Sequence, residues 1–179
     1  MNEEIKFLKE LQHELKTQEI DGQASPRYWV VGDYKWIPTD VDNATRTSIF
    51  TYDDCECMEL ETYIDNLKES GDYTDEQMEE LENIFDWQDD EDTLKWIKEN
   101  VTDDCHLVYE KKEHVIKENT MFLTKQEAKE HIRLNHYHYT KEAHTYAMTA
   151  WRSPQVEKLI NILETFDWDS VKVAQEVKG

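Results

Sequence analysis

Residues 27–37 have the sequence RYWVVGDYKWI, and this stretch decides what kind of fold the chain adopts. Aromatic and β-branched residues dominate it, which is typical of a β-strand. Gly32 lies in the middle of the stretch, where we expect the strand to bend. Pro38 follows directly and should end it, because proline cannot donate a ladder hydrogen bond. The stretch therefore predicts one strand of a sheet.

Further strands and several helices are predicted on either side of this stretch. Strand composition recurs at residues 47–52 and 105–118, while residues 143–151 suit a strand but are also compatible with a helix. Apolar residues at helical spacing predict helices at 3–16, 58–67, 74–85, 93–100, 125–134 and from 153 onward. Two of these helices have clear start signals, a capping box from Thr74 to Gln77 and a cap at Thr124.

Strands and helices are mixed without a regular strand–helix–strand alternation, which favours the α+β class. We expect a small sheet with packed helices. A chain of 179 residues, 38% of them hydrophobic, fits one domain with a real core. We therefore expect residues 1–179 to form a single domain, with residues 53–100 as an acidic helical insertion or subdomain.

Charge is the dominant feature of the composition. The chain has 41 acidic and 20 basic residues, a formal net charge of -21. Such a charge governs partner choice and association rate rather than fold. It argues against direct binding of nucleic acid and against anionic membranes. It favours a basic protein partner, such as a groove built to hold DNA or RNA.

The negative charge is concentrated in the middle of the chain. Residues 51–92 contain eighteen acidic side chains and one basic one, Lys68, whereas residues 111–179 contain ten acidic and eleven basic side chains. The eighteen predicted partner-binding residues are Asp53, Asp54, Glu56, Glu59, Glu61, Asp65, Glu69, Asp72, Asp75, Glu76, Glu79, Glu80, Glu82, Asp86, Asp89, Asp90, Glu91 and Asp92.

Two interpretations of this acidic segment are open. The first is a merely solvated helix face. The second is imitation of a phosphate backbone, which explains why the chain tolerates like charges that destabilise a helix by a few tenths of a kcal/mol per i,i+4 pair. Carboxylates would then contact a basic channel, and Trp87 and Tyr73 would be the aromatic anchors.

A group of histidines in the C-terminal third suggests a catalytic alternative. His136 and His138 would share one face of an extended segment, with His131, His144 and Arg152 nearby in the sequence. Such a group can act as acid and base in RNA cleavage, while arginine stabilises a phosphate. Packing of the histidines in a polar core, or contact with a ligand, explains the same pattern. We therefore regard an enzyme as the weaker interpretation.

The remaining sequence features argue against several kinds of site and location, and they assign no function. Three cysteines, an odd number, do not suggest a disulfide scaffold, and the spacing of Cys55, Cys57, Cys105 and His106 is not that of a standard zinc site. We predict no metal and no cofactor. There is no signal-peptide pattern and no apolar run of membrane-spanning length, so we expect a cytoplasmic protein.

Two stretches of the chain resemble a known group of proteins. They are FLTKQEAKEHIRLNHYHYTKEAHTYAMTAWRSP (residues 122–154) and LKTQEIDGQASPRYWVV (residues 15–31). Both are similar to segments of uncharacterised proteins from phages, prophages and conjugative elements. Together they cover about a quarter of the chain and leave out the acidic middle.

The resemblance implies a counter-defence role, because small acidic proteins from such sources often block host immunity. By analogy of size, charge and source, the chain resembles a type II anti-CRISPR, an inhibitor of the Cas9–guide RNA complex. An anti-restriction DNA mimic is the nearest alternative. Two others are an enzyme built on the histidines and a binding module that sequesters a nucleotide with Arg133 and Arg152.

Overall fold

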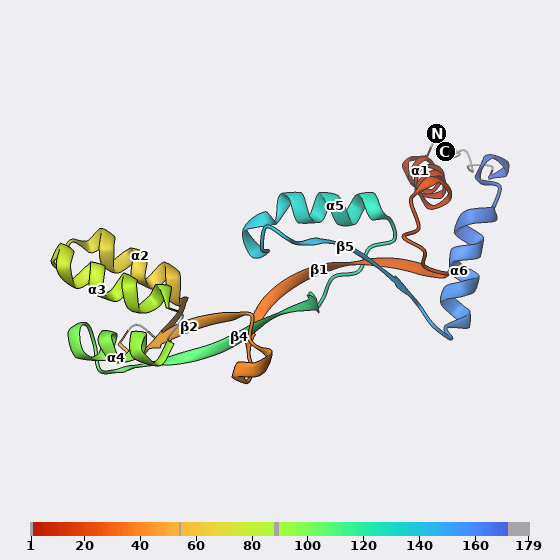
Figure 1. The fold of residues 1–179 in the computed structure, drawn as a ribbon. Helices are drawn as coiled ribbons and strands as arrows, with labels where there is room; N and C mark the ends of the chain where they lie inside the picture. The colour runs from red at the N-terminus through yellow and green to blue at the C-terminus, as the bar shows by residue number, and fades with distance from the viewer. Residues whose placement is uncertain (1, 54, 88–89, 172–179) are drawn as a thin grey trace. The chain divides into compact units, whose positions relative to one another are not determined.

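The computed structural model describes residues 2–53, 55–87 and 90–171, and in these ranges it has six α-helices and a five-stranded sheet of order β3-β2-β4-β1-β5 (Figure 1). The strands are β1 (Arg27–Pro38), β2 (Arg46–Thr51), β3 (Glu56–Glu59), β4 (Cys105–Ile116) and β5 (His144–Thr149). The α-helices are α1 (Glu3–Thr17), α2 (Leu60–Ser70), α3 (Asp75–Asp86), α4 (Asp90–Asn100), α5 (Lys125–Leu134) and α6 (Pro154–Thr165). The predicted α+β class is confirmed.

Local sequence signals located most of these elements. The capping box at the start of α3 is present, with the Thr74 side chain accepting from the backbone N–H of Gln77. Thr124 likewise accepts from the backbone N–H of Glu127 at the start of α5. The segment 143–151, for which a helix was also considered, contains strand β5, which pairs antiparallel with β1.

Other expectations were wrong. Met58 and Glu59 do not begin a helix but belong to β3, because they pair with Ile49 and Ser48 of β2. Residues His136–His138 form a 3-10 turn rather than an extended segment, so His136 and His138 do not share a strand face. The fourth helix also begins at Asp90, three residues before the predicted start. The expectation that Pro38 ends the first strand is confirmed, because β1 ends at that residue.

The chain divides into two compact units, and β1 and β4 supply residues to both. The acidic unit is Lys35–Glu113, and the terminal unit is Met1–Tyr34 with His114–Gly179. The predicted acidic segment 53–100 falls entirely within the acidic unit. That unit carries 25 acidic and 7 basic residues, a formal charge of -18, whereas the terminal unit carries 16 and 13, a formal charge of -3.

The acidic unit has its own hydrophobic core. Helix α2 packs on β2 and β3, and α3 packs against α4. Leu81 and Ile97 are completely buried, and Ile49 and Leu60 are almost so. These side chains are contributed by all three helices and by β2, so the apolar faces of the amphipathic helices meet in one cluster.

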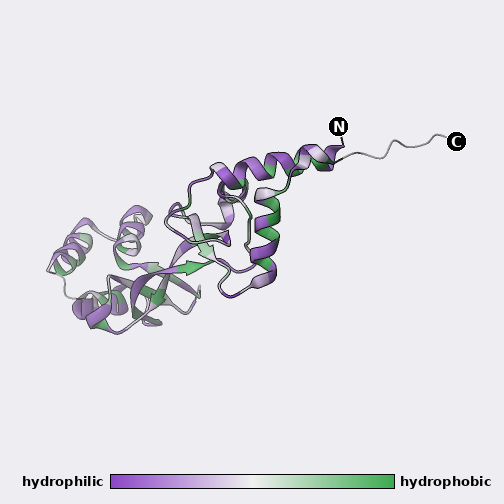
Figure 2. Cartoon of the chain, turned by 90° about the vertical axis from the view of Figure 1, so that its right-hand side faces the viewer, coloured by the Kyte–Doolittle hydropathy of each residue, from purple (hydrophilic) through white to green (hydrophobic). Residues whose placement is uncertain are grey.

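The terminal unit contains two smaller apolar clusters. Leu15 of α1 packs with Ile160 and Leu163 of α6. Trp29 of β1, completely buried, packs with Ala128 of α5 and Ala147 of β5. Figure 2 shows helices with hydrophobic stripes on otherwise hydrophilic surfaces, as expected for helices that bury one face. No helix in the described ranges is long and apolar enough to cross a membrane.

Candidate functional site

The described members of the predicted partner-binding set all belong to the acidic unit. We call the sixteen described members of the predicted set the acidic surface, since Asp54 and Asp89 lie outside the described residues. Three members, Glu59, Glu82 and Asp90, are half-buried. The other thirteen are exposed: Asp53, Glu56, Glu61, Asp65, Glu69, Asp72, Asp75, Glu76, Glu79, Glu80, Asp86, Glu91 and Asp92.

Helix geometry arranges part of this surface in a row. Glu61, Asp65 and Glu69 follow one another at four-residue spacing on α2, so their side chains lie on one face. Ile64 of the same helix is buried in the core. The amphipathic pattern that anchors α2 therefore directs three carboxylates outward together.

Two hollows lie within the acidic surface. The first has a volume of about 280 Å³ and is lined by Glu61, Ile64, Asp65, Glu82, Phe85 and Asp86. The second has a volume of about 360 Å³ and is lined by Thr47, Glu59, Leu60, Glu61, Phe85 and Asp90. They share Glu61 and Phe85, so both are lined by carboxylates together with apolar side chains. Such a lining suits a lysine or arginine side chain, whose stem is apolar and whose head is charged.

Members of the acidic surface make both charged and neutral contacts within their unit. Lys68, the single basic residue between positions 51 and 92, pairs with Glu82. Glu80 accepts a hydrogen bond from the indole Nε1 of Trp96 at 3.2 Å, and Asp90 accepts one from the Thr47 hydroxyl at 2.8 Å. Neither of those donors carries a charge, so these two hydrogen bonds do not neutralise the Glu80 and Asp90 carboxylates.

The two predicted aromatic anchors differ in their accessibility. The side chain of Trp87 is 85% exposed, directly after α3. Tyr73 is half-buried and its ring lies 6.3 Å from that of Trp96, within the hydrophobic core. Trp87 is therefore available to a partner, whereas Tyr73 stabilises the unit itself.

The histidines of the alternative catalytic site belong to different elements. His131 on α5 is half-buried, with its Nε2 atom 2.7 Å from the Tyr139 hydroxyl. His136 and His138 are exposed on the 3-10 turn, and His144 is half-buried on β5. His131 has the environment of a packed, hydrogen-bonded histidine, in agreement with the polar-core interpretation.

The two arginines proposed for this region differ in their surroundings. The guanidinium of Arg133 donates to both carboxylate oxygens of Glu130, three residues earlier on α5. Arg152 is exposed and has a positive φ of 56° in the turn before α6. A phosphate at Arg133 would have to compete with the Glu130 carboxylate that already occupies the guanidinium.

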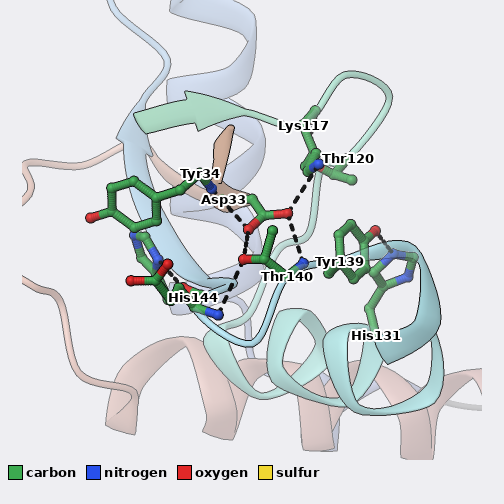
Figure 3. Close-up of polar contacts among 9 residues, drawn as sticks. Asp33, Tyr34, Lys117, Thr120, His131, Tyr139, Thr140 and His144 are labelled. Carbon is green, nitrogen blue, oxygen red and sulfur yellow. Dashed lines mark hydrogen bonds and ion pairs between the residues drawn. The ribbon is translucent and has the colours of Figure 1, made fainter. Parts of the chain in front are cut away.

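A buried carboxylate in the terminal unit was missed by the sequence analysis (Figure 3). Asp33 is completely buried and accepts hydrogen bonds from the Thr140 hydroxyl at 2.5 Å and the Tyr34 backbone N–H at 2.8 Å. Its second oxygen accepts from the Thr140 backbone N–H at 3.2 Å and pairs with Lys117 Nζ at 3.0 Å.

These contacts decide the ionisation state of Asp33. Burial by itself raises the pKa of a carboxyl group, but the hydrogen bonds from Thr140, Lys117 and Tyr34 outweigh it and lower the pKa of Asp33 to about 2. Asp33 is thus a permanent anion at neutral pH, and both of its oxygens are occupied. It joins β1 to the segments on either side of α5, which is a structural role.

The cysteines do not form a site together. Cys55 and Cys57 are exposed, whereas Cys105 is buried. Although the Cys57 residue is exposed as a whole, desolvation of its thiol and the negative charge of Glu110 raise the pKa of that thiol, against weaker opposing effects of Ser48 and Arg46. Across the described part of the chain, no group of three or more His, Cys, Asp or Glu side chains is arranged to hold a metal ion.

No protein-family model, curated protein or solved structure matches the chain. The acidic surface combines exposure, density of charge, two hollows and an exposed tryptophan within one unit. Those properties are suited to binding a positively charged macromolecule.

Proposed function

We propose that the protein is a phage-encoded counter-defence factor whose acidic surface occupies the nucleic-acid-binding cleft of a host nuclease. The observation that supports this best is the exposure of thirteen carboxylates on a unit of formal charge -18. A cleft that binds DNA or RNA is lined by lysine and arginine. The carboxylates would contact those side chains in place of phosphates and exclude the nucleic acid.

The charges would govern the rate of binding as well as its strength. A surface of one sign steers an oppositely charged partner over distances of about one Debye length, about 10 Å at 0.1 M salt. Once docked, the two hollows would receive basic side chains, and Trp87 would supply an aromatic contact. This mode of action is stoichiometric and uses no catalysis and no cofactor.

The first target to test is the Cas9–guide RNA complex, in the cytoplasm of the host cell. The resemblance of residues 15–31 and 122–154 to phage and prophage proteins favours a defence nuclease as the partner. Both stretches lie outside the acidic unit, so they bear on the source of the chain rather than on its binding surface. Restriction nucleases are the second group of targets.

The test is co-purification with guide-loaded Cas9, followed by a DNA-binding competition at several salt concentrations. We expect one inhibitor per nuclease, loss of DNA binding, and an affinity that falls steadily as salt rises. Failure to bind Cas9 and a panel of restriction nucleases at 50 mM salt would refute the proposal. Binding that does not change with salt would refute the electrostatic mechanism.

A matched pair of variants isolates the acidic surface from total charge. The first carries Glu61→Gln, Asp65→Asn and Glu69→Gln on α2. The second carries Glu4→Gln, Glu14→Gln and Glu118→Gln, three exposed carboxylates of the terminal unit. Both have the same net charge, so equal losses of affinity would show that only total charge matters. We expect a loss of about tenfold or more for the first variant alone.

A further inference from the structure

Two histidine side chains lie close together over Gly32 in the terminal unit. Gly32 lies on β1 opposite His144 of β5. A methyl group on Gly32 would meet the Nε2 atom of His114 at 2.6 Å and that of His144 at 2.9 Å. The missing side chain therefore leaves space in which imidazoles from β4 and β5 meet over the strand between them. Their ring centroids are 5.2 Å apart.

We propose that His114 and His144 together bind a divalent transition-metal ion, such as Zn²⁺, Ni²⁺ or Cu²⁺. Imidazole nitrogen is a preferred ligand of these ions, with bonds of about 2.0–2.1 Å to zinc. The two Nε2 atoms already approach a common point over Gly32 to within 3 Å. His114 is exposed and His144 half-buried, so the ion reaches both from solvent.

The hydrogen bond of His144 leaves its Nε2 atom available to a metal ion. Its Nδ1 atom lies 3.0 Å from the backbone carbonyl oxygen of Glu142, and a carbonyl oxygen can only accept. Nδ1 therefore carries the proton and Nε2 carries the lone pair. Figure 3 shows His144 beside Tyr34, with Asp33 directed elsewhere. A ring N–H donated to a carbonyl is the usual second contact of a metal-ligating histidine, because it fixes the tautomer and the ring orientation.

The surroundings define what kind of metal site this is. The His114 ring packs against Tyr34 at 5.4 Å and Tyr146 at 5.1 Å, which limits its rotation. Within the described ranges no third His, Cys, Asp or Glu side chain joins the pair. Water or an external ligand fills the other coordination positions, so the site is open rather than closed. It lies in the terminal unit and does not depend on the acidic surface for its ligands.

The site is tested by titrating ZnCl₂ into the purified chain at pH 7.5, with binding followed by calorimetry and by histidine NMR signals. We expect one site at which the His114 and His144 signals shift together. His114→Ala or His144→Ala should each weaken binding by about tenfold or more. His136→Ala and His138→Ala, at exposed histidines outside the pair, are the controls. Retention of full affinity in the His114→Ala, His144→Ala double variant would overturn the proposal.

Gly32→Ala provides a sharper variant, because it keeps both histidines and fills the space between them. We expect it to lose zinc binding. If it fails to fold, the unaltered chain still decides the question through electron paramagnetic resonance of bound Cu²⁺. Two coordinated nitrogens support the pair as ligands, and none or one overturns it.

Discussion

The acidic unit and the terminal unit are packed in a similar way but differ in how far their carboxylates are paired with basic side chains. Both pack amphipathic helices against strands around apolar clusters. In the terminal unit, Lys125 pairs with Glu19 and Asp21, and Lys117 pairs with Asp33. In the acidic unit, thirteen of the predicted carboxylates are exposed, with few cations near them in the sequence. An excess of acid is therefore not a requirement of this fold, which favours a functional origin for it.

Part of the electrostatic cost in the acidic unit is offset by where the charges lie. The first turns of α3 and α4 carry Asp75 and Glu76, and Asp90, Glu91 and Asp92. Carboxylates at a helix N-terminus interact favourably with its dipole, by about 0.3–1 kcal/mol each when exposed. The repulsive row on α2 lacks this compensation beyond Glu61, its member in the first turn.

The largest effect should come from the buried ion pair of the acidic unit. Arg46 donates to Glu110 at 2.6 Å, and Glu110 also accepts from the Ser48 hydroxyl at 2.6 Å. Arg46→Ala leaves a buried carboxylate without its cation, so we expect a loss of about 3–5 kcal/mol in unfolding free energy, measured with urea. Lys68→Ala, which breaks an exposed pair with Glu82, is the control and should cost less than about 1 kcal/mol. Equal losses of unfolding free energy in the two variants would contradict the expected difference between a buried and an exposed ion pair.

The corresponding buried carboxylate of the terminal unit should be less sensitive. Asp33→Asn removes the charge that Lys117 meets and should cost about 1–3 kcal/mol. The pKa of Asp33 is lowered in the folded state, so its contribution is complete above the ordinary pKa of 3.8 and is lost as pH falls toward 2. Urea unfolding of both chains at pH 7, 4 and 2.5 should show the difference shrinking. A constant difference would rule out ionisation as its cause.

Helix caps provide a smaller comparison between the units. Thr74→Ala and Thr124→Ala each remove a cap and should lower the unfolding free energy by about 1 kcal/mol. We expect the greater loss at Thr124, which is 2% exposed, because water cannot replace its hydrogen bond easily. Serine at either position should restore most of the stability. Thermal unfolding of the four variants tests this order of stability losses. A greater loss at Thr74 than at Thr124 would contradict it.

The smallest effect concerns the row of charges on α2. Asp65→Asn abolishes both like-charge repulsions at i,i+4 spacing in the row, the one between Glu61 and Asp65 and the one between Asp65 and Glu69. We expect the chain to become more stable by a few tenths of a kcal/mol per pair at low salt. The gain should disappear near 0.5 M NaCl, where screening is strong. Glu118→Gln, exposed in the terminal unit, should give no such gain.

Elements with local causes could be predicted from the sequence. The caps at Thr74 and Thr124 act within three residues, so their helices began where expected. The stretch around Trp29 was recognised as a strand from composition alone. The exposure of most of the acidic surface also followed from helical spacing, because the apolar positions determine which face is buried.

Features that depend on distant partners could not be predicted. Strand β3 exists because Cys57 and Met58 pair with β2, although their neighbours favour a helix. Asp33 is buried because Thr140, 107 residues away, supplies its hydrogen bonds. The pairing of His114 with His144 over Gly32 likewise requires knowing which strands are neighbours. His114 was not among the histidines singled out from the sequence, since it lies far from the others along the chain.

The separate cores also bear on how such a molecule can evolve. The cluster around Leu81 draws its residues from the acidic unit, and the clusters around Trp29 and Ile160 draw theirs from the terminal unit. The three clusters share no residue. The charged exterior of the acidic unit can therefore change without touching the side chains that pack the clusters of the terminal unit.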